Sequence, residues 1–65
     1  MTKKEAIIAM KEGKLLTHKY FSKEEWVTII DGQIHFEDGV SCSEEEFWKY
    51  RTDWWWNDDW KLFEY

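Results

Sequence analysis

The sequence predicts one small α+β domain, residues 1–65, built from an antiparallel sheet, an N-terminal helix and a second short helix in the order α-β-β-β-α-β. Three observations support this class. The chain opens with a capped amphipathic segment, an Asp31-Gly32 pair separates two β-rich runs, and another capped helix is expected after Ser43. A chain of 65 residues has room for one core.

The first element is a helix that begins after Thr2. Thr2 and Glu5 have the spacing of a capping box, in which each side chain accepts a hydrogen bond from the backbone N–H of the other residue. An apolar stripe follows over residues 6–10 at helical spacing. Gly13 is expected to end the helix, because glycine readily adopts the left-handed backbone of a C-cap.

The first two strands are predicted over residues 14–21 and 26–30. Both runs are rich in β-branched, aromatic and large aliphatic residues, which suit a pleated sheet. Between them, Ser22 and Glu25 repeat the capping-box spacing and predict a single helical turn within the connection.

The Asp31-Gly32 pair is the strongest local signal. An Asp-Gly pair between β-rich runs predicts a tight hairpin turn, so residues 33–36 return as the third strand. Residues 37–39 form the next turn. Residues 40–42 are too short to assign to a strand or a loop.

The second helix is predicted over residues 44–51. Ser43 and Glu46 make a third capping box, and three acidic residues stand at the positive end of the coming helix dipole. Residues 52–59 are typical of a loop or an irregular edge. Residues 60–65 alternate between two faces and predict the closing strand.

Composition excludes several classes of protein. A single cysteine rules out an internal disulfide, and no Cys/His spacing matches a structural zinc site. The longest apolar run, residues 6–10, is far too short to span a membrane, and no signal peptide is visible. We therefore expect a cytoplasmic protein without membrane contact. A hydrophobic content of 43% is too high for a disordered chain.

The small size favours self-association. Ordering 65 residues costs on the order of 100 kcal/mol, which one small core offsets only barely. Without a disulfide or a metal, the remaining aids are large buried side chains and oligomerisation. Six Trp, three Tyr and four Phe supply the first, and we expect a homo-oligomer as the second.

Charge is unevenly distributed along the chain. Residues 1–23 hold six Lys and two Glu, a net charge of +4, whereas residues 24–65 have a net charge of −9. This division indicates one basic edge and one acidic face. Binding of extended nucleic acid is not expected, because the summed charge of −5 repels phosphates.

Catalysis is not expected either. Cys42 has only His18 and His35 as candidate bases, and a Cys–His nucleophile also needs a third group to orient the base. A lone cysteine in a small core is far more often a buried apolar residue. Neighbouring acidic residues on a strand point to opposite faces and rarely chelate a metal together. We expect no enzyme, no metal and no cofactor.

The run Trp54-Trp55-Trp56 is the anomaly in this sequence. Three consecutive side chains cannot all face one core, because they alternate in a strand and fan out in a helix. One interpretation is that two of them cap the core and the third makes an oligomer contact. The other is an aromatic wall that stacks a nucleobase, which is worth roughly 1–3 kcal/mol per base.

Polar residues near the run can complete a ligand site. Arg51 precedes it and can pair bidentately with phosphate, and His18 and Lys19 lie on the basic edge. For His18 and His35 taken alone, the more frequent role is a surface histidine on a strand. The candidate ligand-binding residues are Trp54, Trp55, Trp56, Arg51, His18, Lys19 and Tyr20.

Both ends of the chain resemble a known family. The matching segments are Glu5-Ala6-Ile7, Met10 to Lys14, His18-Lys19 and Asp58-Asp59-Trp60. They are similar to the Thoeris anti-defence family of small phage-borne proteins, whose members commonly begin with an EAL-x-x-L-K-x-G-K helix and finish with an x-D-D-W strand. The resemblance covers roughly residues 5–19 and 57–64, and His18 stands where the family usually carries arginine.

This resemblance implies a compact α+β domain that assembles as a homo-oligomer. It also implies a pocket near the subunit interfaces that sequesters a cyclic nucleotide or an ADP-ribose-type immune signal without cleaving it. The first functional hypothesis is therefore a phage anti-defence protein with a small nucleotide-type ligand.

Two further hypotheses remain open. The chain can be an acidic inhibitor that docks on a host nucleic-acid enzyme or defence protein, with exposed Trp as the anchor. It can also be a small structural or assembly protein without a ligand. The feature that separates the three is which Trp is exposed, and beside which charges.

Overall fold

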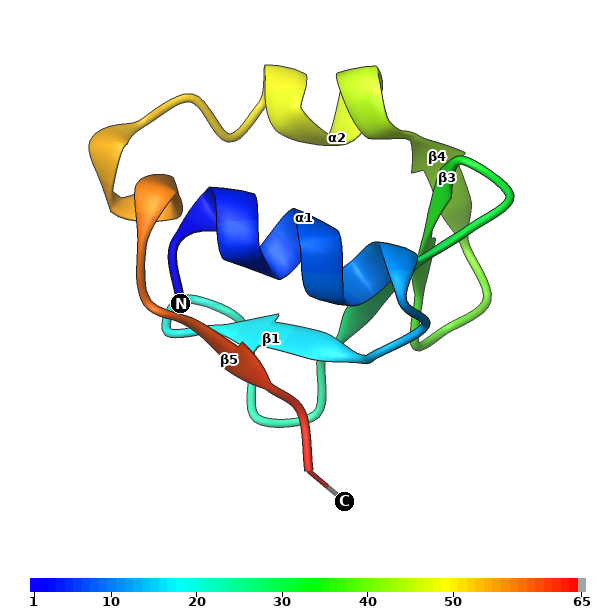
Figure 1. Ribbon diagram of the computed structural model, residues 1–65, viewed down its shortest axis with the longest axis horizontal. Helices are drawn as coiled ribbons and strands as arrows, with labels where there is room; N and C mark the ends of the chain where they lie inside the picture. The colour runs from blue at the N-terminus through cyan, green and yellow to red at the C-terminus, as the bar shows by residue number, and fades with distance from the viewer. Residues whose placement is uncertain (65) are drawn as a thin grey trace.

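The computed structural model describes residues 1–64, which form the predicted α+β class: two α-helices, one 3₁₀ turn and a five-stranded antiparallel sheet (Figure 1). The elements are α1 Lys3–Lys11, β1 Leu16–His18, β2 Val27–Ile30, β3 Gln33–Phe36, β4 Ser41–Ser43, α2 Glu44–Lys49, η1 Trp54–Asn57 and β5 Trp60–Leu62.

Helix α1 begins at the predicted capping box. The Glu5 amide donates to Oγ1 of Thr2 at 3.2 Å, and the Thr2 amide donates to Oε1 of Glu5 at 2.9 Å. The hydrogen bond from the Thr2 amide to the carboxylate, and then the Thr2 side chain, lower the pKa of Glu5 below its ordinary value. The helix ends before Gly13, whose φ of +88° is the left-handed backbone expected there.

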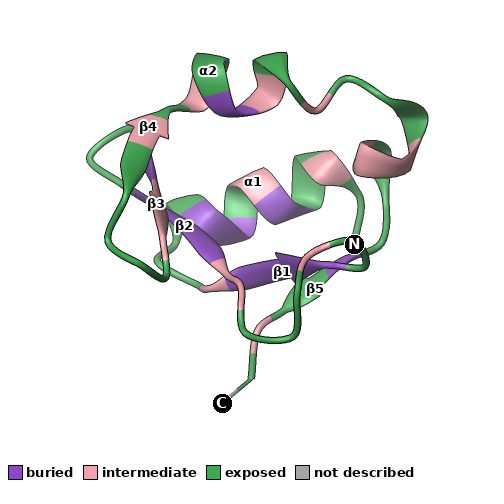
Figure 2. Ribbon diagram, turned by 180° about the vertical axis from the view of Figure 1, so that it is seen from behind, coloured by how far each residue is buried: buried purple, intermediate pink, exposed green. Residues whose placement is uncertain are grey.

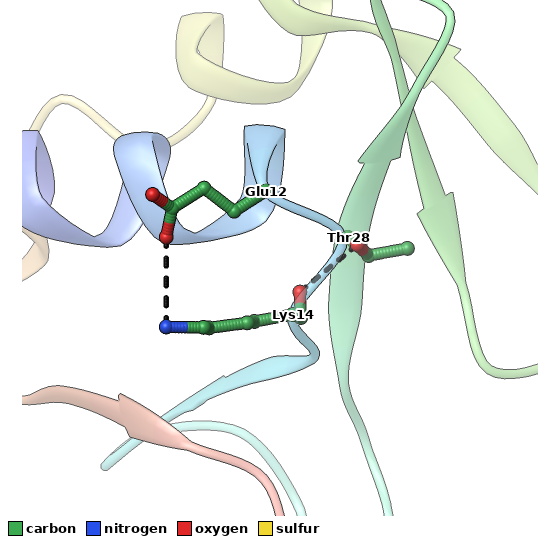
Figure 3. Close-up of polar contacts among 3 residues, drawn as sticks. All are labelled: Glu12, Lys14 and Thr28. Atoms are coloured by element: carbon green, nitrogen blue, oxygen red, sulfur yellow. Dashed lines mark hydrogen bonds and ion pairs between the residues drawn. The ribbon is translucent and has the colours of Figure 1, made fainter.

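The turn after α1 holds one ion pair of its own and is tied to the sheet by one hydrogen bond (Figure 3). The Lys14 ammonium lies 3.5 Å from Oε1 of Glu12, and Oγ1 of Thr28 donates to the Lys14 carbonyl at 2.9 Å. The ion pair is exposed and worth little, whereas the hydroxyl of Thr28 satisfies a loop carbonyl that β2 approaches. This bond fixes where the chain enters β1.

The sheet has the strand order β4-β3-β2-β1-β5, and every neighbouring pair is antiparallel. Its β2–β3 hairpin confirms the Asp-Gly prediction, since Ile30 pairs with Gln33 across the turn. Asp31 and Gly32 have φ of 51° and 77°, as a type I′ turn requires.

Four predicted elements are shorter than expected, and one of them, the second strand, covers 27–30 instead of 26–30. The first strand covers 16–18 instead of 14–21, because the Phe21 amide turns back to the His18 carbonyl at 2.9 Å. The second helix stops at Lys49 instead of Arg51. The closing strand covers 60–62 instead of 60–65, and Tyr65 lies outside the described residues.

Two connections also differ from the sequence interpretation. Ser22 and Glu25 form a turn instead of a helical turn, with the Ser22 amide donating to Oε1 of Glu25 at 2.9 Å. The unassigned segment contributes an additional strand, β4, in which Cys42 pairs with Ile34 of β3. Ser43 ends this strand and caps α2, because its hydroxyl accepts from the Glu46 amide at 3.1 Å.

The core lies between the curved sheet and α1, with α2 on the far side of α1 from β1 and β5 (Figure 1). Figure 2 shows the buried residues concentrated along α1, β1 and β2. The buried apolar residues are Ala6, Ala9, Met10, Leu16, Val27, Ile29, Ile34, Phe47 and Trp60. Trp60, only 1% exposed, is the largest fully buried side chain, so β5 is held chiefly by its first residue.

Candidate functional site

Two aromatic side chains, Tyr20 and Trp55, meet where the chain leaves β1 and where η1 begins. Tyr20, 58% exposed, and the half-buried Trp55 line an open depression of about 290 Å³. The two residues are brought together from opposite ends of the chain by the β1–β5 pairing. This depression is the candidate ligand site.

The three consecutive tryptophans point in three directions. They lie on the 3₁₀ turn η1, where successive residues are about 120° apart. Trp54 is 76% exposed, Trp55 lines the depression, and Trp56 packs against the core. The expectation that at least one of them is exposed is confirmed. One Trp lies on the surface, one lines the depression and one packs against the core.

The depression is a corner and not a slot. The ring centroids of Tyr20 and Trp55 are 6.0 Å apart and their planes meet at 80°. A ring sandwiched between two parallel faces needs about 7 Å between them, twice a van der Waals contact of about 3.5 Å. A planar ligand would therefore stack on the face of one ring and turn its own edge toward the other.

His18 lies underneath this corner and not on the surface. It is 2% exposed, which corrects the expectation of a surface histidine on a strand. Its Nδ1 accepts a hydrogen bond from the Tyr20 amide at 3.1 Å, and its Nε2 faces the Trp55 and Asp58 carbonyl oxygens at 3.0 and 2.7 Å. Both ring nitrogens thus contact backbone groups, and neither is directed into the depression where a ligand would bind.

Arg51 packs against the rings of Phe47 and Trp56. Its guanidinium carbon is 4.1 Å from the ring centroid of Phe47 and 5.5 Å from that of Trp56, and Nη1 donates to the Phe47 carbonyl at 3.1 Å. Burial lowers the pKa of Arg51, and its Nε has no hydrogen-bond partner within residues 1–64. Arg51 therefore braces η1 against α2 and does not line the depression.

Lys19 carries positive charge to the rim. Its Nζ lies 5.8 Å from the ring centroid of Tyr20. Lys19 also lines a second open depression of about 470 Å³, together with Met1, Asp58, Asp59, Trp60 and Lys61. Lys61 was not among the candidate residues predicted from the sequence. The β1–β5 pairing places it opposite Thr17, and it lines this second depression together with Lys19.

The structure brings five of the seven candidate residues around one corner. Tyr20 and Trp55 line it, Lys19 flanks Tyr20, and Trp54 contacts Trp55 with ring centroids 5.8 Å apart. Trp56 contacts Tyr20 from the core side at 6.3 Å. The two remaining candidates, His18 and Arg51, support the corner from within.

The other reactive groups lie apart from this corner. Cys42 pairs with Ile34 while His35 pairs with Ser41, and adjacent strand positions point to opposite faces. Burial, and then Glu46, raise the pKa of the Cys42 thiol. Within residues 1–64, no three His, Cys, Asp or Glu side chains are grouped to hold a metal ion. No helix in this range is long and apolar enough to cross a membrane.

Comparisons of the chain with protein-family models, with curated proteins and with solved structures found no match. The functional inference therefore starts from the corner formed by Tyr20 and Trp55 and from the charges around it.

Proposed function

We propose that this chain is a non-catalytic binding protein whose Tyr20–Trp55 corner receives the planar ring of a nucleotide-derived ligand. The observation that carries the proposal is the exposed edge-to-face pair lining an open depression, with the Lys19 ammonium beside it. An aromatic face and a nearby cation are the two features that a base and its phosphate require.

The energetics indicate what else the site needs. Stacking one base contributes roughly 1–3 kcal/mol. A micromolar dissociation constant corresponds to about 8 kcal/mol, so a single stack does not sequester a ligand by itself. Contacts from Lys19 and Lys61 to phosphate add to the stack. We propose that a second copy of the chain covers the open side, in keeping with the homo-oligomer expected from the small size.

The resemblance of both chain ends to the Thoeris anti-defence family supplies the ligand class. The proposed ligand is a cyclic nucleotide or an ADP-ribose-type immune signal, held without cleavage. In this proposal the chain acts as a phage anti-defence protein in the host cytoplasm.

A second candidate function is favoured by Trp54. It is 76% exposed and does not line the depression, and its acidic neighbours Asp53, Asp58 and Asp59 are exposed as well. An exposed Trp with surrounding carboxylates suits docking on a basic protein surface. The chain would then inhibit a host nucleic-acid enzyme or a defence protein.

Calorimetric titration with AMP, ADP-ribose and cyclic di-AMP tests the first candidate, with tryptophan fluorescence as a second readout. We expect binding by at least one of these probes, and its loss in Tyr20→Ala. Tyr50→Ala is the matched control, because Tyr50 is 72% exposed at the end of α2 and does not line the depression. Absence of binding by all three probes at millimolar concentration would contradict the proposal.

The inhibitor candidate makes a different prediction. Trp54→Ala should weaken binding to a purified host partner, and rising salt should weaken it further, because exposed charges are screened. The same variant should keep its affinity for a nucleotide probe if the corner alone binds the ring.

A further inference from the structure

We infer that His18 is the positioning residue of the Tyr20–Trp55 corner, and that its buried imidazole sets the separation of the two walls. The inference rests on the proposed function, since it takes the corner as the binding site. It deepens that function by assigning the site's geometry to a residue that the ligand does not touch.

One imidazole contacts the backbone of both walls. The Tyr20 amide donates to Nδ1 at 3.1 Å, while Nε2 lies 3.0 Å from the carbonyl oxygen of Trp55. Tyr20 and Trp55 are thus held to the same five-membered ring, although 35 positions separate them in the sequence. A shift of the His18 imidazole would therefore change the distance between Tyr20 and Trp55.

The hydrogen bonds specify one tautomer. A backbone N–H can only donate, so Nδ1 must present its lone pair to Tyr20. In a neutral imidazole the hydrogen then resides on Nε2, which donates to the carbonyl oxygens of Trp55 and Asp58. These carbonyls belong to the second residue of η1 and to the residue that follows η1, and such carbonyl groups lack partners within so short a helix.

Aromatic packing fixes the plane of the imidazole. Its centroid lies 4.4 Å from that of Trp56 and 4.8 Å from that of Trp60, and Phe21 packs at 6.1 Å. The ring is 2% exposed, so water does not compete for its hydrogen bonds. A buried and fully paired ring can transmit the position of η1 to the backbone of Tyr20, in addition to the ring contacts of Tyr20 with Trp55 and Trp56.

Two conservative variants separate the two contacts. Asparagine places an amide oxygen near the position of Nδ1 and keeps an acceptor for Tyr20. Glutamine places an amide nitrogen near the position of Nε2 and keeps a donor for Trp55. His18→Phe retains a flat ring but removes both contacts. His35→Asn and His35→Gln on β3 are the matched controls, because His35 lines neither depression.

Nuclear magnetic resonance tests the inference without any ligand. In the wild-type protein we expect the imidazole nitrogen shifts of His18 to report a protonated Nε2 and an unprotonated Nδ1. We expect slow hydrogen exchange of the Tyr20 amide in the wild type and in His18→Asn, and exchange at least tenfold faster in His18→Gln. The opposite tautomer, or equal exchange in the two variants, overturns the inference.

Binding of AMP gives the second readout. We expect His18→Phe to bind AMP about tenfold more weakly than the wild type, because both contacts that hold the walls at one separation are lost. The affinities of His18→Asn and His18→Gln for AMP should each lie between those of His18→Phe and the wild type. If wild-type protein binds no AMP, ADP-ribose or cyclic di-AMP, the proposed function fails. The tautomer and exchange measurements still decide whether His18 joins the walls.

Discussion

The indole N–H of Trp60 donates a hydrogen bond to the backbone oxygen of Trp56 at 2.8 Å. This bond joins the largest fully buried side chain of the protein to η1. The neighbouring carbonyl, that of Trp55, is met by Nε2 of His18. Two buried ring nitrogens therefore hold the 3₁₀ turn from below, and the exposed faces of the tryptophans are oriented by the core.

Trp60→Phe should destabilise the protein by about 1–3 kcal/mol. The substitution keeps an aromatic ring but leaves the Trp56 carbonyl without its buried donor, whose cost lies in that range. Guanidinium denaturation followed by circular dichroism measures the change. Trp54→Phe is the control, because a side chain that is 76% exposed should change stability by less than about 0.5 kcal/mol. Equal effects of the two variants would contradict this role of Trp60.

Arg51→Lys should lower the free energy of unfolding by about 1 kcal/mol even though it keeps the charge. The planar guanidinium lies over Phe47 and near Trp56, and an ammonium cannot reproduce both face contacts and the bond to the Phe47 carbonyl. Urea denaturation measures this change in the free energy of unfolding. Lys49→Arg, on the exposed side of α2, is the matched control and should be neutral. A neutral Arg51→Lys would show that charge alone matters at this position.

The capping box should make stability depend on pH below 4.5. The pKa of Glu5 is lowered in the folded chain, first by its hydrogen bond from the Thr2 backbone. Its contribution is therefore present above the ordinary value of 4.5 and is lost as the pH falls through the lower, folded value. Thermal unfolding of wild type and Glu5→Gln at pH 7 and pH 3 should show a difference that shrinks at pH 3.

Thr2→Ala tests the other half of the same box. Loss of the hydroxyl that accepts from the Glu5 amide should cost about 1 kcal/mol of stability at pH 7. Thr52→Ala is the control, since Thr52 lies in an exposed loop outside any helix. For Glu5→Gln, a stability difference from the wild type that is the same at pH 7 and pH 3 would mean that the carboxylate of Glu5 does not cap the helix.

Cys42 should react slowly with thiol reagents. Burial raises the pKa of its thiol above the ordinary value of 9.0, so the reactive thiolate is scarce at pH 8. The rate of labelling by a disulfide reagent should be lower in the folded protein than in guanidinium-unfolded protein at the same pH. It should rise as the pH is increased. Identical folded and unfolded rates would contradict the burial of Cys42 on β4.

Local signals identified much of this fold. The sequence predicted the capping box at Thr2, the N-cap at Ser43 and the Asp31-Gly32 turn, because each depends on residues within three or four positions. At Ser43 only the hydroxyl bond of the predicted box is formed. The element lengths were less readable. The first strand ends at His18, where the chain turns back and where its antiparallel partner β5 begins at Trp60, so part of this limit comes from a distant segment.

The sequence by itself determined the α+β class, the helix starts, the hairpin and the impossibility of burying three consecutive tryptophans together. The tertiary structure alone decided that β4 pairs with β3, that Tyr20 meets Trp55, and that His18 and Arg51 lie beneath the corner. The physical reason is range: turns and caps are closed by neighbouring residues, whereas burial and pairing depend on contacts between distant segments that no local pattern encodes.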